Sequence, residues 1–319
     1  MKNIFSFMLA LSALSVSAST LPFLETFDEL TNNASIQNQN GWVLASGTSA
    51  TIQSGVVATN STQALEIQNS QVTHDLSSDG SSIWIRFQAR IIAAPEADPV
   101  ITNTNTSVAF FVNTNRNLVV YNSTNPVVLN TQLSTNEWCQ FDVYCDYANM
   151  KWILSVNGTT VASNLSLYSA NSQIASLQIA NNSANAVYLD ELAVQDTEPA
   201  SGLTDTDGDG LPDWWEQRYT DSITSAATNE IAANGQSFLY NYVAGLDPDN
   251  SSDVLSAVRE NGRRFSWERK AARQYDIYWT SNLTSGFSFI DTADGYEFED
   301  TNTVRTAEAA AFYQIRVHK

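Results

Sequence analysis

The sequence predicts a mainly β protein whose largest part is an antiparallel sandwich. Short runs rich in Val, Ile, Tyr and Trp recur between turn-rich links, and no convincing helix occurs before residue 197. The 319 residues, 43% of them hydrophobic, have room for two or three domains with real cores. We expect three parts, at residues 19–198, 199–253 and 254–319, behind a targeting segment.

Residues 1–18 have the features of a signal peptide. Lys2 supplies the charged start, residues 4–14 form an apolar run, and Val16-Ser17-Ala18 matches the small-x-small cleavage pattern. The run is shorter than a membrane-spanning helix, and no later stretch is long and apolar enough to cross a bilayer. We expect a secreted or cell-surface protein with no transmembrane segment after cleavage.

The net charge of −19 is distributed unevenly. Of the 34 acidic residues, 25 lie before Val254 together with only 6 basic ones, whereas the last 66 residues are neutral. Such a surface repels nucleic acid and anionic membranes. Divalent cations and neutral polymers are the partners that the charge favours.

Seven alternating runs predict the strands of the first part, and Asn157-Gly158 is the best hairpin turn. The runs are 82–92, 107–113, 117–122, 137–147, 151–163, 174–181 and 186–194. Cys139 and Cys145 lie on one face of a single run, roughly 20 Å apart at ~3.3 Å per residue, which is too far for a disulfide. We interpret both as small buried hydrophobic residues.

The segments LPFLETFD, EWCQFDVYCDYANMKWILSVNGTTVAS and VYLDELAV resemble the concanavalin A-like, laminin-G-type jelly roll, over most of residues 21–196. That family includes lectins, carbohydrate-binding modules and glycosidases. Its laminarinase-like catalytic members carry acids at alternate positions of one strand. Here Asp190 and Glu191 are adjacent and point to opposite faces, so we predict no catalytic residues in this module.

A row of polar and aromatic residues is the candidate carbohydrate-binding site. In run 82–92 alternation buries the Ile and Phe positions and turns Trp84, Arg86 and Arg90 to the opposite face. Trp138 and Tyr144 fall on the polar face of their own run. The alternative is that Trp84 packs under a loop or against the next module.

A second metal site is a further hypothesis for the first part. Glu25, Asp28 and Asp190 lie near the first and last strands, which are often neighbours in jelly rolls, and modules resembling this one use acids there for a structural calcium. The alternative is a set of solvated strand ends.

The stretch DTDGDGLPDWWE contains the full D-x-D-x-D-G-x5-E pattern of a calcium loop. Hard oxygen ligands without His or Cys favour Ca²⁺ as the ion. An acidic turn that holds no ion is the alternative. The predicted ligands are Asp205, Asp207, Asp209, the Leu211 carbonyl, Asp213 and Glu216.

The loop differs from a standard EF-hand because no helix precedes it and Pro212 removes an amide. It is similar to the loops of thrombospondin type 3 repeats and dockerins, in which calcium supplies folding energy to short segments. A degenerate repeat follows 25 residues later at 230–241, where Gly235 matches Gly210 but most acids are gone. We expect a loop that has lost most of its ligands, followed by a helix ending at Gly245; whether it binds an ion is left open.

Short strands in residues 254–319 predict a small β-sandwich that resembles a C-terminal module of secreted bacterial proteins. Cell-envelope attachment, sorting and structural support are all compatible with this part. The whole sequence predicts an exported, non-enzymatic, calcium-binding protein that presents a lectin-like domain to a glycan or polysaccharide. A glycoside hydrolase with atypical acids and a structural adhesin without a sugar site are the alternatives.

Overall fold

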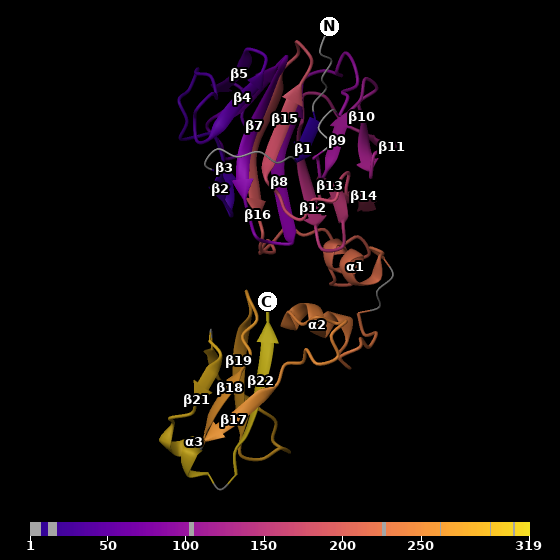
Figure 1. Cartoon of the computed structure of the whole chain (residues 1–319). Helices are drawn as coiled ribbons and strands as arrows, with labels where there is room; N and C mark the ends of the chain where they lie inside the picture. The colour runs from indigo at the N-terminus through magenta and orange to yellow at the C-terminus, as the bar shows by residue number, and fades with distance from the viewer. Residues whose placement is uncertain are drawn as a thin grey trace. The chain divides into compact units, whose positions relative to one another are not determined.

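The computed structural model contains two compact units, each with its own β-structure (Figure 1). The first unit comprises Met1–Thr206 and Pro212–Ile223, and the second comprises Asp207–Leu211 and Thr224–Lys319. The structure describes residues 8–11, 18–101, 105–224, 228–261, 263–293, 295–308 and 310–319. Within these ranges, no helix has the length and apolar character needed to cross a membrane.

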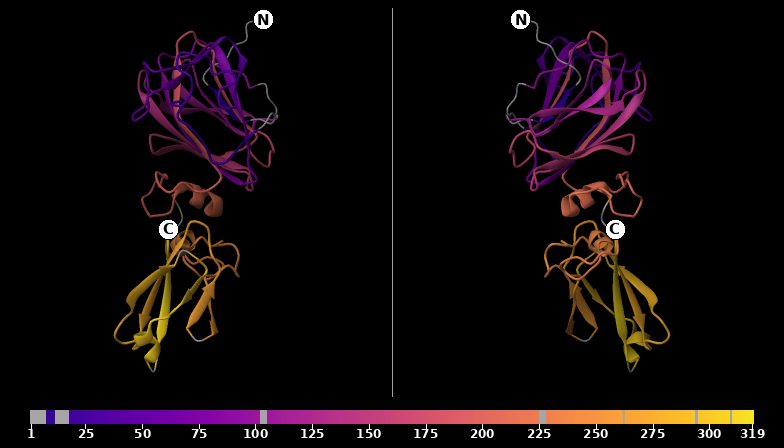
Figure 2. Two further views of the ribbon diagram at one scale, coloured as in Figure 1. Left: turned by 90° about the vertical axis from the view of Figure 1, so that its left-hand side faces the viewer. Right: turned by 90° about the vertical axis from the view of Figure 1, so that its right-hand side faces the viewer.

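The first unit is a β-sandwich of two sheets, which face each other in Figure 2. One sheet contains β1 (Met8–Leu11), β2 (Ser19–Thr20), β4 (Trp42–Ser46), β7 (Ser70–Ser77), β9 (Ala109–Val112), β10 (Asn117–Asn122), β11 (Asn125–Gln132) and β15 (Ser176–Asn181). The other contains β3 (Phe23–Glu25), β5 (Ser49–Gln53), β6 (Ala64–Gln68), β8 (Ser82–Ile91), β12 (Trp138–Asp146), β13 (Lys151–Val156), β14 (Thr159–Ser166) and β16 (Val187–Gln195).

The strand order places sequence-distant segments side by side. The first sheet runs β11-β10-β9-β1-β15-β7-β2 with β4 on β7, and the second runs β14-β13-β12-β8-β16-β6-β5 with β3 on β16. Nearly all pairs are antiparallel, the short β2–β7 pair being parallel. The mainly β prediction is therefore confirmed, and the second sheet has β8 and β12 at its centre.

All seven predicted runs form strands. Asn157 and Gly158 both have positive φ, 49° and 73°, as a two-residue hairpin turn requires. The predicted runs omit β11 and the strands before β8, apart from β3, which lies in the segment LPFLETFD. Packing against the sandwich core forms these strands where local sequence does not.

The core lies between the two sheets and is filled from alternate strand positions. Phe87 of β8 and Phe141 of β12 stack with ring centroids 5.0 Å apart, and both are buried. Cys139 and Cys145 are free and buried on the same side, so the prediction of no disulfide is confirmed. Burial raises the pKa of both thiols, which makes them unreactive.

The predicted signal peptide falls mainly on residues 1–7 and 12–17, which lie outside the described residues. Its apolar centre supplies β1, which pairs antiparallel with both β9 and β15. Cleavage after Ala18 stays a prediction.

The second unit contains a loop–helix segment and two three-stranded sheets, β17-β18-β21 and β20-β19-β22. A core of Trp267, Tyr275 and Ile277 lies at its centre, which confirms the small C-terminal sandwich. The prediction of short strands missed the helix α3. The elements are α2 (Phe238–Ala244), β17 (Ala257–Asn261), β18 (Arg264–Trp267), β19 (Gln274–Thr280), β20 (Ser288–Ala293), β21 (Glu297–Glu299), α3 (Thr303–Ala307) and β22 (Phe312–His318).

Candidate functional site

Five predicted glycan-binding residues share the outer face of the second sheet of the first unit. Alternation along β8 turns Trp84, Arg86 and Arg90 away from the core. In the β8–β12 register Trp138 lies opposite Arg90, and Tyr144 lies opposite Trp84. The antiparallel pairing therefore assembles one continuous face from two strands that are about 50 residues apart in sequence.

The Trp84 end of this face is covered by α1 (Asp213–Thr220), the helix that follows the acidic loop. Trp214 of α1 meets Trp84 edge-on at 5.4 Å between ring centroids, and Tyr144 lies 5.2 Å from Trp84 and 5.5 Å from Trp214. Tyr144 is only 5% exposed, and burial raises its pKa. These three rings pack on one another, so Trp84 and Tyr144 hold the helix on the sheet.

Polar contacts at the same end anchor the helix further. Arg218 of α1 donates through Nη1 to Ser82 Oγ at 3.1 Å, and the same nitrogen lies 3.4 Å from Asp146 Oδ2. Asp146 is buried. Burial alone would lower the Arg218 pKa, but Asp146, Tyr144 and Tyr219 together outweigh it and raise the pKa. An ion pair in this sheltered position is screened less by salt than a surface pair.

Arg86, in the middle of the face, is also occupied. It pairs with Asp142 through Nε and donates through Nη2 to the Gly202 carbonyl at 2.7 Å. Gly202 has φ of 74°, and a Cβ there would lie 2.8 Å from the Arg86 guanidinium, so this approach requires glycine. A cavity of about 100 Å³ remains beside these contacts, lined in part by Trp84, Tyr144 and Trp214.

The Arg90 end has different neighbours. Trp138, Arg90 and Tyr188 lie in direct register across β12, β8 and β16, and Glu66 of β6 continues the row. All four are half-buried on the outer face. Burial and Glu66 raise the pKa of Tyr188, while Arg90 lowers it. Sequence reasoning did not assign Tyr188 or Glu66, although the alternation of VYLDELAV could have placed Tyr188 outward.

Three predicted metal ligands converge in the acidic loop. Asp205, Asp207 and Asp209 each offer a carboxylate oxygen, and these oxygens all lie within 4.8 Å of one another. Among the described residues they are the one such group of three acidic, His or Cys side chains. The Asp209 side chain also accepts the Leu211 amide at 2.8 Å, and Gly210 has φ of 97° at the turn. This Asp triad is able to hold a metal ion.

Asp213 and Glu216 lie apart from that group. Asp213 Oδ1 accepts the Thr206 amide at 2.7 Å, and its Oδ2 accepts the hydroxyls of Thr206 and Thr160. Glu216 is fully buried within α1. Asp213 is therefore held by Thr206 and Thr160, and the structure brings together three of the five predicted carboxylate ligands.

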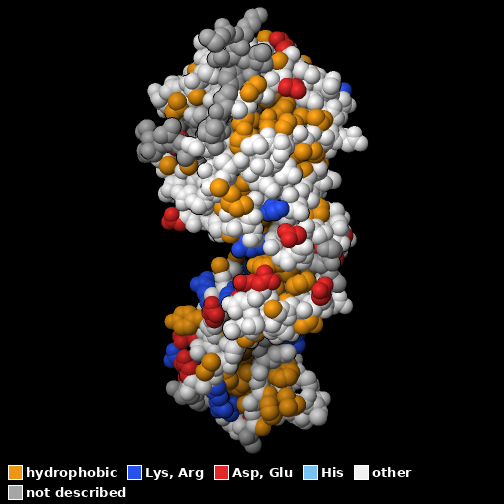
Figure 3. All heavy atoms as spheres, turned by 45° about the vertical axis from the view of Figure 1, so that its right-hand side comes forward, with side chains coloured by type: hydrophobic (Ala, Val, Ile, Leu, Met, Phe, Trp, Pro, Cys, Tyr) orange, Lys and Arg blue, Asp and Glu red, His pale blue; other side chains and the backbone are white. Residues whose placement is uncertain are grey.

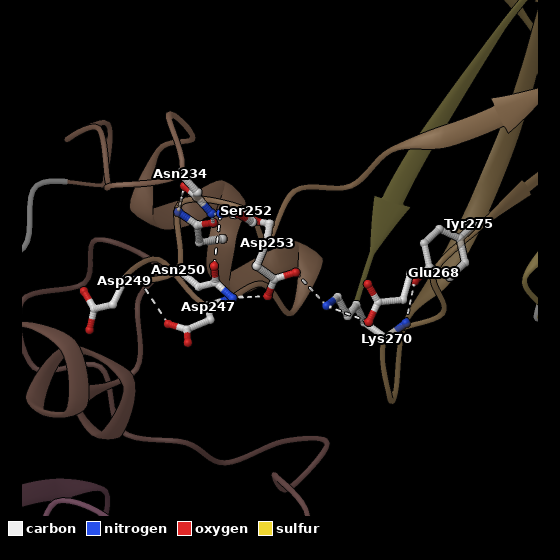
Figure 4. Close-up of polar contacts among 10 residues, drawn as sticks. Asn234, Asp247, Asp249, Asn250, Ser252, Asp253, Glu268, Lys270 and Tyr275 are labelled. Carbon is white, nitrogen blue, oxygen red and sulfur yellow. Dashed lines mark hydrogen bonds and ion pairs between the residues drawn. The ribbon is translucent and has the colours of Figure 1, made fainter.

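The second loop (230–241) is closed by amide groups where the first has acids. Asn234 Nδ2 donates to Asn241 Oδ1 at 2.5 Å, and Asn241 Nδ2 donates back to Asn234 Oδ1 at 3.2 Å. Asn234 also donates to the carbonyl of Asp253, whose carboxylate accepts Lys270 Nζ at 2.7 Å and the Asp247 amide (Figure 4). Asn234 and Asn241 occupy positions that correspond to predicted metal ligands in the first loop. Their side chains instead form hydrogen bonds with other groups of the protein.

Glu25, Asp28 and Asp190 are bound by N–H and O–H donors. Glu25 accepts Phe27 N, Asn40 Nδ2 and Trp42 Nε1. Asp28 Oδ1 accepts groups from Ser61, Thr62 and Gln63, and Asp190 accepts Ala58 N, Glu191 N and Ser61 Oγ. Ser61 therefore links two of the acids, while Glu25 has separate partners.

The environments of Asp28 and Asp190 move their pKa values apart. Burial raises the pKa of Asp190 to about 6, against the effect of its hydrogen bonds. Burial opposes ionisation of Asp28 as well, but its donors from Thr62, Gln63 and Ser61 outweigh it and lower the pKa. Such divergence can mark an acid–base pair, but Asp190 is fully buried here.

Comparison with known proteins gives no sequence relative, since no family model and no curated protein matches the chain. Three solved structures with low TM-scores are a sialidase (0.43, 9% identity), the alginate lyase Aly36B (0.39, 11%) and domain 4 of AbnA, a GH43 arabinanase from Geobacillus stearothermophilus (0.37, 14%). Each match covers 56% of this chain, and it covers 18%, 98% and 93% of the respective structure. At these values the likenesses carry no argument about function.

Proposed function

We propose that this chain is an exported, non-catalytic protein that binds carbohydrate on the outer face of its first unit and holds Ca²⁺ in its acidic loop. The observation that carries the carbohydrate proposal is the row of Trp138, Arg90 and Tyr188. Two aromatic rings on either side of a hydrogen-bond donor offer apolar faces for stacking and a polar group for orientation. The row lies on rigid strands rather than on loops, which keeps its geometry fixed.

The Trp84 end of the predicted platform has another role in this proposal. Trp84 and Tyr144 are the surface on which α1 packs, so the glycan site is the Arg90 end alone. Trp84→Ala should therefore lower the stability of the first unit, whereas Trp138→Ala should weaken glycan binding with little loss of stability.

The calcium proposal rests on the converging carboxylates of Asp205, Asp207 and Asp209. Three negative charges within 4.8 Å repel one another unless a cation lies between them. Oxygen ligands suit Ca²⁺, and its remaining ligand positions are open to backbone carbonyls and water. Bound calcium would supply the charge that orders this loop ahead of α1.

We propose no hydrolytic activity, because Asp190, one of the two acids that Ser61 links, is fully buried. Asp28 and Asp190 are engaged by internal donors, and Asp190 has no exposed surface. Glycoside hydrolysis needs two carboxyl groups that flank an accessible bond.

A glycan array probed with the full chain, with matched hydrolysis assays, tests these proposals together. Binding that Trp138→Ala and Tyr188→Ala each weaken about tenfold supports the site, since stacking on one ring contributes ~1–1.5 kcal/mol. Release of cleaved sugar would favour the hydrolase alternative. Binding to no glycan by the folded chain would favour the structural adhesin.

A further inference from the structure

Two arginines on the same face of β8 have opposite surroundings. Arg86 is neutralised by Asp142 and capped by the Gly202 carbonyl. Arg90, four residues further along the strand, takes part in none of the ion pairs among the described residues. Its Nε is buried and donates to no acceptor in that part of the chain. A half-buried guanidinium without an acid is costly unless a ligand completes its hydrogen bonds.

From this contrast we propose that Arg90 binds the carboxylate of an acidic sugar, a uronic acid, within the glycan. The inference rests on the proposed carbohydrate function and names its ligand class. A guanidinium presents two parallel N–H groups that match the two oxygens of a carboxylate, and such a bond is stronger than one to a hydroxyl. Neutral sugars offer no charged group to pair with Arg90.

The neighbours of Arg90 set the direction of the bound chain. Trp138 and Tyr188 are on the strands to either side of Arg90, and neighbouring strands lie ~4.8 Å apart, so the two rings are separated by roughly 10 Å. This distance is comparable with a disaccharide in an extended polysaccharide. A glycan that crosses the strands therefore stacks on both rings and places the carboxylate of the intervening sugar at Arg90.

The net charge of −19 opposes an anionic ligand only weakly at this position. Charges beyond ~8 Å are largely screened at physiological ionic strength. In the view of Figure 3 the charged side chains of the first unit are scattered and do not form one patch. Glu66 is the acid of the row itself, and it lies two strands from Arg90. The local attraction of Arg90 thus dominates at the site.

Titration calorimetry of the full chain with two matched trisaccharides tests the proposal. One is β-1,4-linked glucuronate and the other is cellotriose, which differs only in lacking the carboxylates. We expect the glucuronate trisaccharide to bind at least about tenfold more tightly, the difference that one charge-assisted pair supplies. Arg90→Gln should abolish this preference, and Arg90→Lys should keep part of it, because Lys retains the charge without the planar fork.

Arg86→Gln is the matched control, since its arginine is already paired, and it should leave the preference unchanged. A preference for cellotriose, or a glucuronate preference that survives in Arg90→Gln, would overturn the inference and leave carbohydrate binding standing. If neither trisaccharide nor any glycan on the array binds to the folded chain, both the inference and the proposed function fail. Circular dichroism of each variant verifies folding.

Discussion

The first loop (205–216) and the second loop (230–241) have a glycine at the same relative position and each leads into a short helix, yet their polar groups behave in opposite ways. In the first loop carboxylate oxygens of Asp205, Asp207 and Asp209 converge to within 4.8 Å of one another. In the second loop Asn234 and Asn241 satisfy each other, and Lys270 neutralises the nearby Asp253. The first loop has three acids that could hold a metal ion, and the second supplies its own hydrogen bonds.

The helices that follow the two loops also differ in the kind of side chain that holds them in place. Aromatic rings hold α1, through Trp214 on Trp84 and Tyr144. An arginine holds α2, because Arg273 donates to the carbonyls of Tyr242 and Val243 at the helix C-terminus. Two similar loop–helix segments can therefore keep the same backbone arrangement while different side chains hold each helix in place.

The largest expected difference between the two segments is the stability cost of replacing the second residue of the helix in each. Trp214→Ala should lower the unfolding free energy of the first unit by about 3 kcal/mol, because it removes a packed indole from the α1 contact. Leu239→Ala at the equivalent position of α2 should cost less than about 1 kcal/mol, since Leu239 is 37% exposed. Urea unfolding with hydrogen exchange in peptides of each unit measures both. Equal costs would contradict the comparison.

Calcium should distinguish the two loops next. Addition of 10 mM CaCl₂ in place of a chelator should stabilise the first loop by about 1.4–2.7 kcal/mol, for a Kd of ~10⁻³ to 10⁻⁴ M. Protease cutting at 205–211 should then slow by roughly ten- to a hundredfold. Asp209→Ala should remove this protection, and Asn234→Ala should not. If calcium does not change the rate of protease cutting, the first loop is an acidic turn that binds no ion.

Loss of the amide pair should destabilise the second loop regardless of ions. Asn241→Ala removes the two hydrogen bonds between Asn234 and Asn241 and should cost about 1–2 kcal/mol. Hydrogen exchange in peptides covering 228–253 should rise by the same amount with calcium and with chelator. A calcium-dependent cost would show that the second loop also binds an ion.

The smallest effect concerns pH and Asp253. Burial alone would raise the Asp253 pKa, but Lys270 and the Asp247 amide hold it below the ordinary value of 3.8. Stability from this pair is therefore present above pH 3.8 and is lost as the pH falls through the lower, folded pKa.

Lys270→Met should accordingly cost about 1 kcal/mol at pH 7 and progressively less in acid. Lys151→Met, which removes a lysine that contacts an asparagine, should show no such pH dependence. Hydrogen exchange between pH 7 and 3 measures the difference, in the second unit for Lys270→Met and in the first unit for Lys151→Met. A cost that stays constant with pH would exclude the Asp253 pair as its cause.

Much of the fold followed from local sequence. Alternation placed Ile85 and Phe87 of β8 in the core and Trp84 and Arg90 on the opposite face, because successive side chains of a strand point to opposite sides. The spacing of Asp205, Asp207 and Asp209 likewise indicated their convergence, since one short loop contains all three.

Tertiary structure decided the rest, because it depends on which strands become neighbours. Pairing of β8 with β16 brought Tyr188 beside Arg90 across about 100 residues, and no local pattern encodes that register. Packing of α1 on the sheet turned Asp213 toward Thr160 and covered Trp84. The sequence by itself thus determined which residues of β8 face outward and that Asp205, Asp207 and Asp209 lie close together. Long-range contacts alone determined which of those residues stay available to a ligand.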